Sequence, residues 1–213
     1  YMNPTTPAVP VRSAEPTSKN SSSIVPFYQF KAATDFKTKE AEKKIKKLNA
    51  QKTATSSSNN ENHKIEAKID RLKEMITNCH QIEAKENFDF WNEKLTKAPD
   101  QFPYLSKLAS SQNSLFGSTG NIENLKNAET YLVQLNEKTN YSKPSHLQAL
   151  ARNYISQHSF QEALELLLKA ENIGDNLQAS QKMLFDVYLE LGDSEKAGAY
   201  LEKFKNFSDF DYL

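Results

Sequence analysis

Cysteine and histidine are the side chains of this sequence best suited to nucleophilic or metal chemistry. Cys79 is the only cysteine and directly precedes His80. Neighbouring residues on a helix point about 100° apart, so the imidazole cannot activate the thiol, and we interpret Cys79 as a small, partly buried apolar residue. His63, His146 and His158 fall in different expected elements without ligand spacing, which predicts no metal site.

Acidic side chains are frequent but do not indicate catalysis. Glu162 and Glu165, for example, have the spacing of a solvated helix face, and no feature marks the pair as a general acid and base. Glycine-rich phosphate loops are absent from the sequence. The sequence therefore predicts a protein that is not an enzyme, with no catalytic residues and no cofactor.

A basic run lies in an expected helix from residue 36 to 51. Its four lysines are Lys43, Lys44, Lys46 and Lys47. Glu40 and Glu42 interrupt the charge, and no aromatic residues alternate with the lysines as base stacking requires. Contact with phosphates or a membrane surface is the alternative, but we favour a solvated helix face and expect no nucleic-acid partner.

The composition excludes several classes of protein. The 213 residues carry 27 basic and 27 acidic side chains, so no net field attracts the chain to nucleic acid or an anionic membrane. No apolar run is long enough to span a bilayer, and one cysteine excludes an internal disulfide framework. We expect a soluble chain without membrane insertion. Because it begins at Tyr1 rather than methionine, an upstream signal or lipid anchor stays open, and with it a cytoplasmic or periplasmic location.

The chain divides into three expected regions. Residues 1–35 hold five of the eight prolines and a serine run, which predicts a disordered tail. Residues 36–62 are expected to form a short charged helix followed by a polar linker beginning at Thr53. Residues 63–213 show helical periodicity throughout and are expected to form one helical repeat domain. Whether this domain continues beyond Leu213 is left open.

Residues 63–99 contain two groups of apolar side chains. The first is Ile65, Ile69, Leu72, Ile76 and Cys79, and the second is Phe88, Trp91 and Leu95. The segment is either one long helix or two helices folded back near residues 83–86, and we favour the pair. Further helices are expected on both sides of Gly117 and Gly120, with Asn121 as a cap, and another is expected to open at Ser142 and Pro144.

A repeat of 34 residues is visible in the second half. Residues 150–170 and 184–204 agree at five positions: Leu150 and Leu184, Tyr154 and Tyr188, Ala163 and Ala197, Leu167 and Leu201, and Lys169 and Lys203. This length and pattern of large, small and tyrosine positions resembles the tetratricopeptide repeat (TPR) family. Two units are clear, at about 144–211, and units upstream are degenerate. His158, Gln181 and Phe204 depart from the family pattern.

The resemblance implies an all-α fold, in which stacked antiparallel helix pairs form a short right-handed TPR-like superhelix. It further implies a non-catalytic interaction module or scaffold that holds a protein or peptide partner on its concave face. The residues at the corresponding positions are Gln148, Arg152, Asn153, Lys182 and Asp186. An acidic Asp186 opposite Arg152 argues against the family's carboxylate clamp, and leaves either an ion pair between repeats or a groove of mixed charge.

A second function is considered beside the first. The chain would then be a structural or membrane-tethered accessory subunit of a larger complex, docking through its tail or through the open end of the array near Leu213. A binding site in the groove and a binding site in the tail predict opposite results when the tail is removed.

Overall fold

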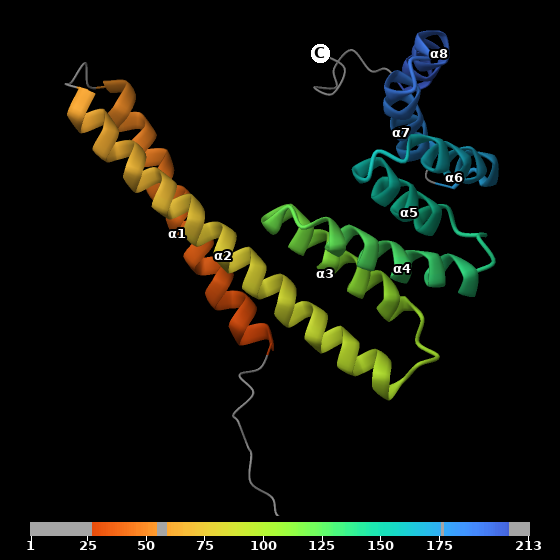
Figure 1. Cartoon of the computed structure of the whole chain (residues 1–213), viewed down its shortest axis with the longest axis horizontal. Coiled ribbons are helices and arrows are strands. Elements are labelled where there is room, and N and C mark those ends of the chain that lie inside the picture. The colour runs from red at the N-terminus through yellow and green to blue at the C-terminus, as the bar shows by residue number, and fades with distance from the viewer. Residues whose placement is uncertain (1–26, 55–58, 176, 205–213) are drawn as a thin grey trace, which may run out of the picture.

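The described part of the chain is entirely α-helical. The computed structural model describes residues 27–54, 59–175 and 177–204. Its helices follow one another as α1 (Phe27–Ala54), α2 (Asn59–Lys97), α3 (Pro103–Thr119), α4 (Ile122–Lys138), α5 (Pro144–Ser156), α6 (Phe160–Ile173), α7 (Leu177–Glu190) and α8 (Ser194–Phe204). Each helix packs mainly on its neighbours in sequence, so the helices form successive antiparallel pairs, as in a repeat array (Figure 1).

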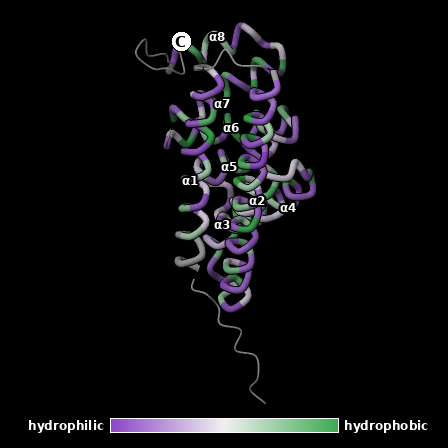
Figure 2. The backbone as a smooth tube through the Cα atoms, turned by 90° about the vertical axis from the view of Figure 1, so that its left-hand side faces the viewer, coloured by the Kyte–Doolittle hydropathy of each residue, from purple (hydrophilic) through white to green (hydrophobic). Residues whose placement is uncertain are grey.

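The first two helices form a long hairpin that extends beyond the shorter helices α3–α8 (Figure 1). Helix α1 packs on α2, and α2 then packs on α3. Along the tube of Figure 2, hydrophilic and hydrophobic stretches alternate within the helices, as expected for helices with one buried face. No helix among the described residues is both long and apolar enough to cross a bilayer.

Three expectations for the first hundred residues need correction. Helix α1 begins at Phe27, so residues 27–35 are helical rather than part of the tail, whereas residues 1–26 lie outside the described part. Helix α2 begins at Asn59, inside the expected linker. The favoured pair of helices in residues 63–99 is wrong, because α2 runs unbroken to Lys97. Its first apolar group faces α1. Its second faces α3 and α4, where Trp91 packs on Tyr104 and Phe88 on Tyr131 at centroid distances of 5.4 and 6.3 Å.

Helix ends follow the local sequence, with one exception. Gly120 adopts φ 69°, and its N–H donates to the Phe116 carbonyl to close α3, while the Asn121 side chain accepts a hydrogen bond from the Glu123 N–H to open α4. Pro144 opens α5 as expected, but Ser142 does not cap it. The Ser142 hydroxyl instead donates to the Thr139 carbonyl at 2.6 Å.

The core shows the 34-residue period at two of the repeated pairs. Leu150 and Leu184 are buried, and so are Ala163 and Ala197. In the other two apolar pairs one member is buried, Leu167 or Tyr188, and its counterpart, Leu201 or Tyr154, is half-buried. His158 and Gly192, also 34 residues apart, both have positive φ, at 61° and 79°. Histidine rarely adopts this conformation, so the turn geometry is imposed by the repeat rather than by the local residue.

Replacing each of two glycines in the last helix pair by alanine should change stability in opposite directions. Gly192→Ala should lower the free energy of unfolding by about 1 kcal/mol, because φ 79° disfavours a Cβ. Gly198→Ala should raise it by up to about 1 kcal/mol, because Gly198 lies inside α8 and an added Cβ meets nothing within 4 Å. Urea unfolding followed by circular dichroism measures both. Shifts of the same sign would contradict this account.

A buried asparagine joins α4 to α5. The Asn136 side chain is fully buried, and its Nδ2 donates to the carbonyls of Leu132 at 2.9 Å and His146 at 3.1 Å. The His146 ring lies 3.3 Å from the Thr139 hydroxyl. Burial lowers the pKa of His146, and the positive charge of Lys143 lowers it further.

The lowered pKa of His146 should make the free energy of unfolding depend on pH. Since the pKa is lower in the folded chain than the unfolded value of about 6.5, the unfolded chain binds the proton first, and stability falls as the pH drops below that value. His146→Gln should reduce the difference between the free energies of unfolding at about pH 7.5 and at about pH 5.5. An unchanged pH dependence in the variant would show that other groups cause it.

Candidate functional site

Helix α3 carries a stripe of small polar residues on its outer face. Ser106, Ser110, Ser114 and Ser118 follow one another at intervals of four residues and therefore lie in one row along the helix. The buried side of the same helix holds Leu105, Leu108 and Ala109. We call the four serines the serine row. It places hydroxyl groups on a surface where bulky side chains would otherwise cover the backbone.

A first hollow lies between the serine row and α5. Its volume is about 400 Å³. Leu132 and two alanines add apolar surface, while Asn113 and the exposed Arg152 contribute polar groups; the full lining is Ser106, Ala109, Ser110, Asn113, Ser114, Leu132, Ala149 and Arg152. The hollow therefore offers hydroxyl, amide and guanidinium groups over a small apolar surface.

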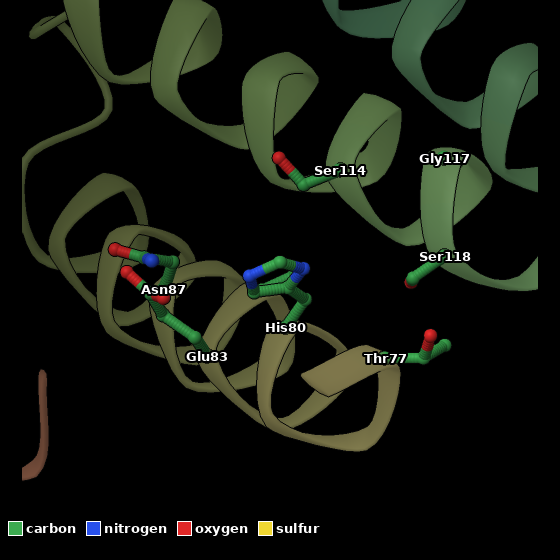
Figure 3. Close-up of a pocket in the computed structure, with 8 residues that line it drawn as sticks. Thr77, His80, Glu83, Asn87, Ser114, Gly117 and Ser118 are labelled. Carbon is green, nitrogen blue, oxygen red and sulfur yellow. The ribbon is translucent and has the colours of Figure 1, made fainter. Parts of the chain in front are cut away.

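A second hollow lies on the other side of the serine row, between α3 and α2 (Figure 3). Its volume is about 430 Å³. Thr77, His80, Glu83 and Asn87 come from α2, and in Figure 3 the His80 ring lies between the two helices. Ser114 lines both hollows, so the two adjoin across α3. We call the combined surface on α2, α3 and α5 the polar groove.

Gly117 contributes to the open space of the groove. It lies inside α3, where glycine costs about 1 kcal/mol relative to alanine. An added Cβ would meet nothing within 4 Å, so packing within the described residues does not require glycine here.

Two of the five residues predicted to bind a partner are instead buried between helices. Gln148 is 5% exposed, and its Nε2 donates to the Ser180 hydroxyl of α7 at 2.8 Å. Asn153 is 2% exposed, and its Nδ2 donates to the Leu125 carbonyl at 3.1 Å. At this burial, both side chains hold neighbouring helices in place and do not reach a partner on the surface.

The other three predicted residues lie nearer the surface. Arg152 is exposed on the polar groove, and its Nη2 lies 3.8 Å from the Met183 sulfur. Lys182 is half-buried on α7. Asp186 is exposed, yet the surrounding protein removes enough water from its carboxyl group to raise its pKa, and Glu190 adds to the effect.

The expected ion pair between Arg152 and Asp186 is not formed. Within the described residues no carboxylate lies within 4 Å of the Arg152 guanidinium. The groove thus presents a positive charge that no carboxylate of this described region neutralises.

The sequence interpretation missed the serine row and the α2 side of the groove. The signal was present as a four-residue spacing of serines opposite the leucines of α3. His80 was considered only with Cys79, and the structure separates the two as expected. Cys79 is buried on the side of α2 facing α1, whereas His80 lines the polar groove.

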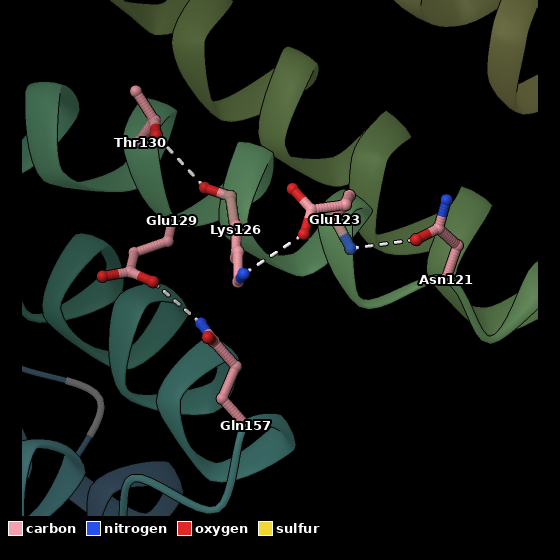
Figure 4. A network of polar contacts seen from close by, with 6 residues as sticks. All are labelled: Asn121, Glu123, Lys126, Glu129, Thr130 and Gln157. Carbon is pink, nitrogen blue, oxygen red and sulfur yellow. Dashed lines mark hydrogen bonds and ion pairs between the residues drawn. The ribbon is translucent and has the colours of Figure 1, made fainter.

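A network of polar contacts next to the groove fixes α4 relative to α5 (Figure 4). The Gln157 amide donates to the Glu129 carboxylate at 2.9 Å and to Asn153 Oδ1 at 2.7 Å. Along α4, Lys126 pairs with Glu123 at 3.1 Å. The bond from Gln157 to Glu129 joins the end of α5 to α4, and Arg152 lies between one and two turns earlier on α5.

The groove brings hydrogen-bonding and charged side chains together. Among the described residues no hydrogen bond joins His80 to Ser114. No group of three or more histidine, cysteine or acidic residues in this part of the chain could hold a metal ion. What the surface can do chemically is donate and accept hydrogen bonds and bind a negative charge.

Fold and site together define an all-α protein of sequentially packed helix pairs with a polar groove. No family model matches the chain, and no curated protein matches it. Among solved structures, it is similar to BtubC (BKLC) from P. vanneervenii, with 14% identity and a TM-score of 0.44, over 84% of this chain and 89% of that chain. Likeness at this level says nothing of function.

The buried Gln148 predicts a loss of stability on truncation. Gln148→Ala leaves the Ser180 hydroxyl, which is fully buried, without the Gln148 donor and should lower the free energy of unfolding by about 1–3 kcal/mol. In a double-mutant cycle with Ser180→Ala, the second substitution should cost less in the Gln148→Ala background. Fully additive effects would contradict a direct bond.

Proposed function

We propose that this chain is a TPR-like, non-catalytic scaffold that binds a segment of a partner protein in the polar groove. The observation that carries the proposal is the continuity of two hollows across Ser114, with an unneutralised Arg152 at one side. The 34-residue period and the buried repeat positions support the resemblance to tetratricopeptide repeats. Helical repeats of this kind present extended concave surfaces to partners.

The lining favours a peptide segment as ligand. Hydroxyls of the serine row and the Asn113 amide can exchange hydrogen bonds with a peptide backbone, and the small side chains allow that backbone to approach closely. The Arg152 guanidinium is suited to a carboxylate, which it can bind through two parallel hydrogen bonds. We therefore propose a partner segment with an acidic residue placed at Arg152.

Residues beyond the groove extend the proposed surface. Lys182 and Asp186 on α7 follow Arg152 along the stack and add charged groups of both signs. Gln148 and Asn153 act indirectly, since their buried hydrogen bonds position α5 against α7 and α4. The alternative, an accessory subunit docking through its tail or the end of the array, depends on residues 1–26 and 205–213, which lie outside the described residues.

Charge reversal at Arg152 tests the proposal. The experiment is affinity capture from native lysate with the full chain. The amount of a specific partner captured by Arg152→Glu should be at least about tenfold lower, because the substitution replaces attraction to a carboxylate with repulsion. Lys138→Glu makes the same charge change on an exposed residue of α4 outside the groove and should retain the partner. Quantitative mass spectrometry compares the captured sets.

A second variant keeps the test decisive. Ser110→Trp fills the hollow beside Arg152 without altering any charge and should displace the same partner. Circular dichroism must show equal helix content in all variants. If Arg152→Glu and Ser110→Trp capture the same proteins as the unaltered chain, the groove is not the binding site.

A further inference from the structure

A second groove runs along one face of the α1–α2 hairpin. Of these two helices, only α2 also lines the polar groove. The second groove consists of two adjoining hollows of about 470 and 490 Å³, which share Lys44 and Arg71. On α1 it extends from Lys37 to Gln51. At 1.5 Å per residue, this is about 20 Å, the length of a helix of about four turns. We call it the hairpin groove.

The base of the hairpin groove is apolar and incompletely covered. Ala41 and Cys79 are buried there, and Leu48 and Leu72 are half-buried. Met75 and Ile82 are 39% and 49% exposed, although they line the same groove. Because α1 packs on α2 and the hairpin extends beyond α3–α8, no other described helix covers this face at its far end.

The rim of the groove is basic. Its charged lining residues are the cations Lys37, Lys44, Lys47, Lys68 and Arg71 and the acids Glu40 and Glu74. Glu40 pairs with Lys44 at 2.7 Å. At the far end, around Leu48 and Leu72, the lining contains four of the cations and no carboxylate. No described carboxylate lies within 4 Å of Lys47, Lys68 or Arg71.

We infer that the hairpin groove binds an acidic amphipathic helix of a partner protein, which packs as a third helix against α1 and α2. Two antiparallel helices with an apolar seam form the hole into which a third helix inserts its apolar stripe, while acidic residues beside that stripe face the basic rim. The occupant would carry apolar residues at intervals of three and four over about four turns, flanked by Glu or Asp.

Other occupants fit the groove less well. Single-stranded nucleic acid is held by stacking on aromatic rings, and no aromatic residue lines the groove. A membrane is contacted by apolar side chains that project from a helix surface, whereas the apolar lining here, apart from the exposed Met75 and Ile82, forms the base of a hollow between two helices.

The test uses the full chain and a labelled synthetic helix of four turns. Its Leu residues occupy the a and d positions of a heptad, and Glu occupies the e and g positions. A second peptide carries Lys at e and g instead. Fluorescence anisotropy should show binding of the Glu peptide and at least about tenfold weaker binding of the Lys peptide.

Paired charge reversals locate the binding. Lys47→Glu with Arg71→Glu changes the rim and should weaken the Glu peptide at least about tenfold. Lys46→Glu with Lys64→Glu makes the same change in net charge on exposed residues of the same two helices outside the groove, and should change affinity less than about twofold.

Two results would overturn the inference. These are failure of the Glu peptide to bind the full chain, or equal weakening by the two double variants. Vesicles containing phosphatidylserine and a single-stranded DNA are measured in parallel, and binding of either without the Glu peptide would assign the groove to that ligand. Concentration-dependent dimerisation in sedimentation, abolished by the rim variant, would assign it to a second copy of the chain.

Discussion

Buried amide side chains cross the boundaries between successive helix pairs, and the relative positions of α4, α5 and α7 depend on them. Asn136 bonds to the start of α5, Asn153 to the carbonyl of Leu125 in α4, and Gln148 to Ser180 in α7. Leucine and alanine contacts supply the burial, but they tolerate sliding and repacking. A buried amide does not, because displacement by one position leaves its donors without acceptors. The shape of the polar groove follows from this constraint.

The repeats themselves could be predicted from sequence, and the reason is physical. Ala163 and Ala197 must be small where two helices approach, and Leu150 and Leu184 must fill space in the core, so the spacing of 34 residues within each pair records the period of the fold. The structure confirms an all-α chain of sequentially packed helices. It also explains His158, which adopts the left-handed turn that Gly192 adopts one repeat later.

The hairpin was harder to predict, because one helix can serve two neighbours. The apolar groups of α2 change face near residues 83–86, and this change resembled a break in the helix. The residues there include Ala84, which is buried, and contain no glycine or proline, so nothing in the backbone interrupts the helix. Prediction of the polar site from sequence was limited in another way. Amide side chains such as Gln148 and Asn153 can be exposed or buried with equal local sequence, and only the packing of the helices decides.

The way each helix packs on its sequence neighbours has a kinetic consequence. Nearly every contact between elements joins segments that are close along the chain, and α5 with α7 is the main exception. Loop closure then costs little entropy at each step, and chains of such low contact order fold rapidly. Helix pairs can therefore form in order as they leave the ribosome, each providing the surface on which the next one assembles.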